Sequence, residues 1–177
     1  MKYFSKFDFK DFWDDSKYSK DNYIEEYPSD ELISEIEQEL GYKLPQSYIA
    51  LMKQHNGGIP FKTCYPMTGN TGWEEDHTAI TGIMGIGKTK PYSLCGSMGS
   101  KFMMEEWGYP DIGIMICDTP TAGHTMIMLD YRKCGNTGEP QVVIVDQENN
   151  YSIDVVAKDF ETFIMGLKSE DEFLMDF

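Results

Sequence analysis

Three short apolar runs, which follow one another in the second half of the chain, constrain its fold more than any other feature. They cover residues 112–117, 126–129 and 142–145, and an aspartate follows each of them. Short apolar runs between turn-forming residues are typical of strands in a mostly buried sheet. The connections between them are too short for helical crossovers, so we expect neighbouring strands to run antiparallel.

Helical patterns flank this predicted sheet on both sides in the sequence. Ser29 can cap a helix with an acidic first turn, Gly41 is suited to end it, and Pro45 favours the start of the next helix. Two N-terminal helices, a short middle helix and a C-terminal helix around an antiparallel sheet predict an α+β fold. The expected helices cover residues 29–41, 45–55, 101–107 and 160–167, and further strands are expected near 61–65 and 79–86.

The length of the chain predicts one domain over residues 1–177, with an arm and a tail at its two ends. The tail at residues 169–177 is acidic and is expected to fray, whereas the arm at residues 1–27 is too aromatic to be disordered. Because the sequence shows neither a signal-peptide pattern nor an apolar run of transmembrane length, we expect a cytoplasmic protein. The residues expected to anchor the arm on the domain are Phe9, Phe12 and Trp13.

The charge of the chain is strongly acidic. It holds 30 acidic residues against 15 basic ones, which gives a net charge of −15. Nucleic acids and anionic membranes require a basic face, so we expect the protein to bind neither. The charge suits a basic protein partner, because opposite potentials speed encounter, although solubility alone is an alternative reason for it.

Residues 82–89 match the phosphate-loop pattern G-x-x-x-x-G-K-[ST] letter for letter. Such a loop must follow a strand and open a helix, because the amides of the helix N-terminus hold the phosphates. Here Pro91 comes two residues after Thr89, and two glycines follow, so a helix cannot begin at Lys88. We therefore do not predict nucleotide hydrolysis from this motif.

Asp118, His124 and Asp130 form the one combination in the sequence that suggests a metal or acid–base site. Carboxylates and an imidazole are suitable ligand types, but these residues lie at loop ends without a local ligand spacing. We favour the interpretation that they are turn and surface residues. The sequence thus predicts no catalytic residue, no metal and no cofactor, and a metal-dependent enzyme is the least favoured hypothesis.

An aromatic residue beside several acids marks a candidate protein-binding surface. Tryptophan is frequent at the energetic centres of interfaces, and neighbouring carboxylates would favour a basic partner. The alternative is that Trp73 is buried and the acids are ordinary solvated surface. The predicted partner contacts are Trp73, Glu74, Glu75, Asp76, Asp118 and Asp130.

Several segments resemble the SUKH superfamily, which includes fungal cell-wall-assembly regulators and many bacterial immunity proteins. The opening signature of the superfamily is matched by Glu39-Leu40-Gly41-Tyr42-Lys43-Leu44-Pro45, followed by Tyr48 and Asn56-Gly57-Gly58. The later segments are Ile112-Gly113-Ile114, Gly123-His124 with Leu129-Asp130, and Phe160 with Phe163-Ile164. Together the segments extend over roughly residues 25–168.

This resemblance implies an α+β fold with a single twisted, mainly antiparallel sheet. For bacterial members it also implies an intracellular immunity protein that neutralises a cognate polymorphic toxin, often a nuclease. The family has no agreed catalytic residues to carry over. We therefore expect a non-catalytic protein-binding module, with a regulatory scaffold as the alternative, and we leave open whether the chain forms a homodimer.

Overall fold

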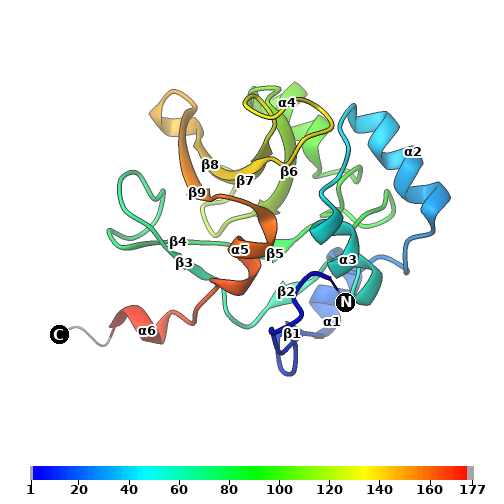
Figure 1. Ribbon diagram of the computed structural model, residues 1–177. Coiled ribbons are helices and arrows are strands. Elements are labelled where there is room, and N and C mark those ends of the chain that lie inside the picture. Colours follow the sequence, from blue (N-terminus) through cyan, green and yellow to red (C-terminus); the bar gives the residue numbers. More distant parts are fainter. Residues whose placement is uncertain (1, 175–177) are drawn as a thin grey trace.

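A five-stranded antiparallel sheet forms the centre of the protein, as the computed structural model shows for residues 2–174 (Figure 1). Three of its strands are the predicted apolar runs, and almost all of their residues are buried. The predicted α+β class and antiparallel pairing are therefore confirmed. In spatial order the strands are β5 (Gly82–Ile83), β6 (Gly113–Asp118), β7 (Thr125–Asp130), β8 (Gln141–Asp146) and β9 (Ser152–Ala157).

Two small antiparallel ribbons lie beside this sheet, so the prediction of a single sheet was incomplete. One joins β1 (Trp13–Asp14) to β2 (Ile59–Pro60), and the other joins β3 (Cys64–Pro66) to β4 (His77–Ala79). The strand expected over residues 79–86 is divided between β4 and β5. The division follows from a change of partner, because Thr81 N donates to the Asp118 carbonyl and turns the chain from the ribbon into the main sheet.

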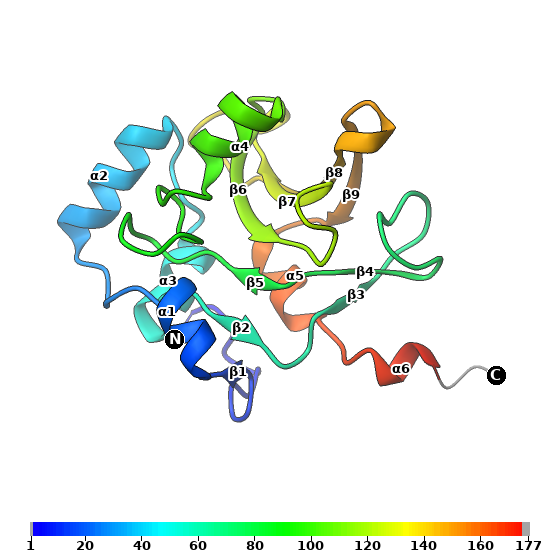
Figure 2. The same ribbon diagram turned by 180° about the vertical axis from the view of Figure 1, so that it is seen from behind.

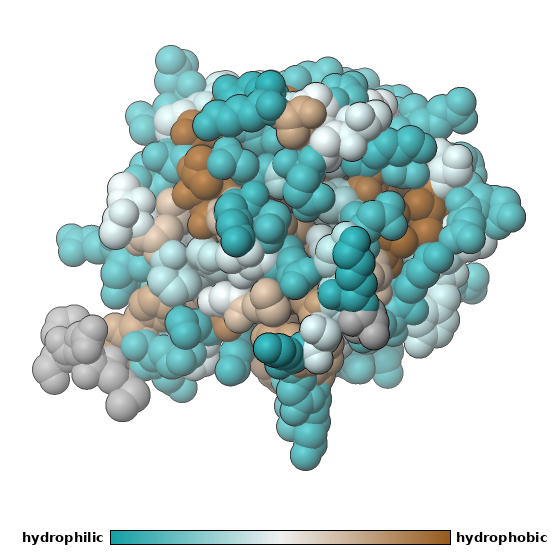
Figure 3. Space-filling model, in the orientation of Figure 1, coloured by the Kyte–Doolittle hydropathy of each residue, from teal (hydrophilic) through white to brown (hydrophobic). Residues whose placement is uncertain are grey.

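The edge strand β9 was not predicted at all. Its residues are mostly half-buried, and Val155 is 51% exposed, because β9 pairs only with β8. An edge strand lacks the continuous apolar run that marks a central strand. The space-filling view shows a mostly hydrophilic face with small hydrophobic areas, one of which lies along β9 (Figure 3).

The helices confirm the predicted capping pattern. The Ser29 hydroxyl accepts a hydrogen bond of 3.1 Å from Leu32 N, and Gly41 ends the helix with a φ of +83°. Inside the fold, Tyr48 and Phe160 pack with ring centroids 4.6 Å apart and connect two helices. The four predicted helices are α2 (Asp30–Leu40), α3 (Gln46–Gln54), α4 (Ser100–Trp107) and α5 (Phe160–Met165).

Both ends of the chain contain helices that were not predicted. The arm packs as expected, with Phe12 buried, but its most deeply buried ring is Tyr23, which follows α1 (Lys17–Asn22). In the tail, residues expected to fray form the exposed helix α6 (Asp171–Leu174), while residues 175–177 lie outside the described part of the chain. None of the helices in residues 2–174 has the length and apolar character that crossing a membrane requires.

Asn56 connects the helical half of the fold to the sheet. Its side-chain oxygen accepts a hydrogen bond of 2.7 Å from Ile86 N, and its amide donates to Ile86 O at 2.9 Å and to Glu26 O at 2.7 Å. A Cβ on Gly57, whose φ is +86°, would lie 2.6 Å from Gly85 N. The sequence Asn56-Gly57 therefore serves a close approach of two backbone segments.

We expect Asn56→Ala to lower the free energy of unfolding by about 3 kcal/mol, because it leaves buried backbone groups without partners. Denaturant unfolding followed by circular dichroism measures this loss. Asn136→Ala is the matched control, since its amide makes one exposed hydrogen bond, to Gly41 O, and should cost less than about 1 kcal/mol. An equal loss of unfolding free energy in the two variants would contradict the role of Asn56 as the connection between the helical half and the sheet.

Candidate functional site

The segment that resembles a phosphate loop is part of the core. No helix begins at Lys88, and Ile86 is fully buried. The amides of Thr89 and Lys90 donate to the Glu25 carboxylate at 2.7 and 2.6 Å, and the Lys88 ammonium pairs with two carboxylates of α2. The groups that would hold a phosphate are thus occupied by the chain's own acids, which favours a structural role for the segment.

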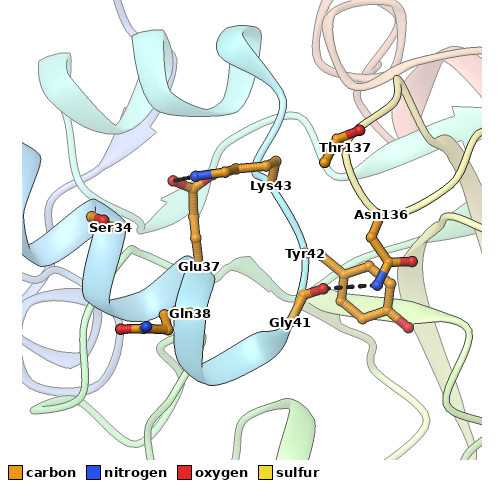
Figure 4. Close-up of a pocket in the computed structure, with 8 residues that line it drawn as sticks. All are labelled: Ser34, Glu37, Gln38, Gly41, Tyr42, Lys43, Asn136 and Thr137. Carbon is orange, nitrogen blue, oxygen red and sulfur yellow. Dashed lines mark hydrogen bonds and ion pairs between the residues drawn. The ribbon is translucent and has the colours of Figure 1, made fainter.

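A hollow of about 360 Å³ lies beside the turn between α2 and α3 (Figure 4). Lys43 Nζ points toward Glu37 and lies 3.6 Å from its Oε1, while the Asn136 amide donates to Gly41 O at 2.9 Å. Leu44 N donates to the other Glu37 oxygen at 2.7 Å. Because these polar groups bind one another, the hollow is better explained as the support of the turn than as a ligand site.

The structure does not bring Asp118, His124 and Asp130 together. Asp118 ends β6 and Asp130 ends β7, and because these strands are antiparallel, the two carboxylates lie at opposite ends of the sheet. His124 is exposed in the turn between them, with Nδ1 3.3 Å from a Glu148 oxygen. Among residues 2–174 there is no group of three or more His, Cys, Asp and Glu side chains that could hold a metal ion.

The Asp130 carboxylate is held inside its own turn. Only 4% of its side chain is exposed, and Arg132 binds it through Nε at 3.0 Å and Nη2 at 2.8 Å. Burial alone would raise the pKa of Asp130, but the hydrogen bonds and charge of Arg132 outweigh burial and lower it. This predicted partner contact is therefore an internal ion pair.

The Asp118 carboxylate also turns inward, but within residues 2–174 no basic side chain pairs with it. The Tyr23 hydroxyl donates to both carboxylate oxygens at 2.9 and 2.8 Å, and Gly82 N donates at 3.1 Å. Burial raises the pKa of Asp118 from 3.8 to about 6, although these hydrogen bonds act in the opposite direction. Asp118 is thus a half-buried acid whose charge is stabilised by hydrogen bonds alone in the described part of the chain.

Asp118 lines a partly enclosed cavity of about 280 Å³ between α4 and the turn at residues 119–123. Trp107 is half-buried in the wall of this cavity. The tryptophan ring also approaches Gly123, where a Cβ would lie 3.0 Å from it. Sequence reasoning missed this cavity, because its walls come from segments that lie far apart in the sequence. Besides residues of the 119–123 turn, the lining of the cavity consists of Tyr92, Met98, Met103, Trp107, Asp118 and Met126.

The acidic loop at residues 73–76 is exposed beside the ribbon of β3 and β4. Trp73 is 45% exposed, and the three acids that follow it are exposed as well. The loop is held by a hydrogen bond from the Thr71 hydroxyl to Glu74 O and by one of 3.3 Å from Glu74 N to His77 O. Trp73 therefore sits in an ordered turn next to exposed carboxylates.

The acidic tail lies next to this loop, which sequence reasoning did not predict. The Phe173 ring stacks on His77 with centroids 4.1 Å apart, and Lys168 pairs with Cys64 of β3. These contacts place exposed tail acids close to Trp73, and Glu170 lines the same shallow hollow as Trp73. We call the combined surface the acidic face; it consists of Trp73, Glu74, Glu75, Asp76, Glu170, Asp171 and Glu172.

The chain belongs to the SMI1 / KNR4 family (SUKH-1), whose family model matches residues 27–166. Proteins of this family are generally non-catalytic binding proteins, and membership supports a role of the immunity-protein or cell-wall-regulator type. A comparison with curated proteins gave no match.

We expect the stability of Asp118→Asn to depend on pH differently from that of the natural chain. The raised pKa means that the folded state holds the proton more tightly than the unfolded state. The contribution of Asp118 to the free energy of unfolding therefore falls as the pH rises from 3.8 through about 6. The neighbouring Tyr23 and Cys117 stay protonated in this range, since burial raises the pKa of each.

The free energy of unfolding of Asp118→Asn, taken relative to that of the natural chain, should therefore rise by about 2 kcal/mol between pH 4.5 and pH 7.5. Urea unfolding of both proteins at the two pH values measures it. Asp130→Asn is the control: because the pKa of Asp130 is lowered below 3.8, its ion pair is charged throughout this range, so the variant should be less stable than the natural chain by a similar amount at both pH values. A stability difference between Asp118→Asn and the natural chain that does not change with pH would contradict this account of Asp118.

Proposed function

We propose that this chain is an intracellular immunity protein that binds and neutralises a basic protein toxin without catalysing a reaction. Family membership supports a binding role of this kind, and the net charge of −15 favours a basic partner. The observation that carries the proposal is the acidic face, where Trp73 is exposed among carboxylates that face solvent. The proposal extends to toxins that cut nucleic acids, because an enzyme that grips a phosphate backbone needs a basic surface.

The acidic face has the composition of an interface with an energetic centre. A half-exposed tryptophan can supply a large apolar contact, and the surrounding acids can steer the partner and exclude wrong ones. Glu74 and Glu75 form no ion pair in the described part of the chain, so their charges are available to a partner. Of the predicted contacts, we keep Trp73 and the three acids after it.

Asp118 and Asp130 are left out of the proposed acidic face. Asp130 is bound to Arg132, and Asp118 is bound to Tyr23 and Gly82. A partner that approached Asp130 would have to break an existing ion pair before it gained a new one. Asp130 is therefore satisfied inside the chain by Arg132, whereas Glu74 and Glu75 are exposed and open to a partner.

The direct test is a native pull-down from the source cell, read by mass spectrometry, with neighbouring reading frames co-expressed. One stoichiometric partner with a basic toxic domain, whose lethality this chain suppresses, is the result that the proposal predicts. Several weakly bound native proteins would instead indicate a regulatory scaffold. Capture of no protein by the full chain, under conditions that retain a known toxin–immunity pair, would contradict both functions.

We expect Glu74→Gln combined with Glu75→Gln to slow association with the partner by about three- to tenfold in low salt. The dissociation rate should change much less, because exposed charges act mainly on encounter. Surface plasmon resonance across a salt series measures both rates and should also show a weaker salt dependence for the variant.

The matched control is Glu26→Gln combined with Glu31→Gln, which removes the same charge from exposed positions near α2. Figure 1 shows α2 and the ribbon of β3 and β4 on opposite sides of the central sheet. The control should change association by less than about twofold. Equal slowing in the two double variants would mean that net charge, and not the acidic face, steers the partner.

A further inference from the structure

The cavity between α4 and the 119–123 turn has the size of a site for one side chain. Its volume of about 280 Å³ falls below the range of roughly 300–1,000 Å³ that is usual for drug-sized ligands and cofactors. Figure 2 shows α4 next to β6, and Met103 and Trp107 of α4 form part of the cavity wall. A single long side chain from a partner protein fits such a space better than a cofactor does.

The cavity walls combine adaptable and rigid groups. Met98, Met103 and Met126 are flexible and polarizable, so they can adjust to the stem of an inserted side chain. Tyr92 is fixed by stacking on Tyr23, with centroids 4.8 Å apart and planes 11° from parallel. Fixed aromatic rings favour a flat cation, because guanidinium groups stack on them.

The electrostatics of the cavity select a cation. Asp118 is half-buried, and its carboxylate is bound by the neutral Tyr23 hydroxyl and the Gly82 amide. Asp130 shows how this chain treats a buried acid elsewhere, since it pairs that carboxylate with Arg132. A guanidinium inserted from outside would supply at Asp118 the partner that Asp130 already has.

The cavity adjoins the acidic face. Thr119 lines the cavity, whereas the next residue, Pro120, lines the shallow hollow that contains Trp73. The hydrogen bond from Thr81 N to the Asp118 carbonyl fixes this turn against the chain that leads from β4 to β5. A protein bound to the acidic face can therefore reach the cavity without covering the rest of the molecule.

The geometry points to this cavity as an anchor pocket that receives one arginine side chain of the protein partner. This inference rests on the proposed function and deepens it, because it names the chemical group that would give the complex its long lifetime. The acidic face would steer the partner, and the pocket would hold it. Burial of a charged pair acts mainly on dissociation, whereas exposed charges act mainly on association.

A small probe tests the pocket without the partner. Nα-acetyl-arginine amide is titrated against protein carrying ¹³C-methyl methionine, and Nα-acetyl-citrulline amide serves as the neutral control of the same shape. We expect the arginine probe to shift the methyl signals of Met98, Met103 and Met126 saturably, at least tenfold more tightly than citrulline. Equal binding of the two probes, or no saturable shift of these signals, would overturn the inference.

Two variants connect the probe to the cavity. Asp118→Asn should abolish the preference for arginine over citrulline, because it removes the negative charge and keeps the shape. Met98→Lys places a cation in the cavity wall and should block the arginine probe, whereas Met98→Gln should not. An arginine preference that persists in both Asp118→Asn and Met98→Lys would show that the probe binds elsewhere.

The partner separates this inference from the proposed function. With the partner captured, Asp118→Asn should weaken the complex by at least about 30-fold through faster dissociation. An unchanged dissociation rate would contradict the anchor pocket and leave the proposed function intact. Saturable arginine binding in a chain that captures no protein would keep the pocket and contradict the proposed function.

Discussion

The buried amide of Asn56 is the interaction on which the arrangement of this fold depends. It pairs with both backbone groups of Ile86 and with Glu26 O, so it joins the arm, the end of α3 and the continuation of β5 at one point. Close contact of Gly57 with Gly85 and the hydrogen bond from the Tyr48 hydroxyl to Met84 O lie on either side of it. Gly85 of the phosphate-like sequence is thus explained by backbone packing, since a Cβ there would lie 2.4 Å from Asn56 O.

Three strands of the central sheet and four helices could be predicted because their signals are local. A continuous apolar run, a capping serine or a glycine at a helix end acts within a few residues, and Ser29 and Gly41 have the roles that their types suggest. The small ribbons and β9 could not be predicted in the same way. Their strands are short or half-exposed, and β5 exists because its chain changes partner at Thr81.

The candidate site was less predictable, because the role of an acid depends on what reaches it from elsewhere in the fold. Asp118 and Asp130 each end an apolar strand, yet one meets Tyr23 from the arm and the other meets Arg132 two residues away. The loop at residues 73–76 was recognised from its composition. The neighbouring tail was not, since only the stacking of Phe173 on His77 brings it there.

The central claim is that one face, formed by the acidic loop, the tail helix and the 119–123 turn, binds a protein partner. Hydrogen–deuterium exchange of the full chain, free and with the captured partner, tests this claim most directly. The account predicts slower exchange of backbone amides at residues 71–76, 98–107 and 118–123 in the complex, with little change in α2. Slower exchange confined to α2 and the turn after it, with no change at the other three segments, would contradict the account.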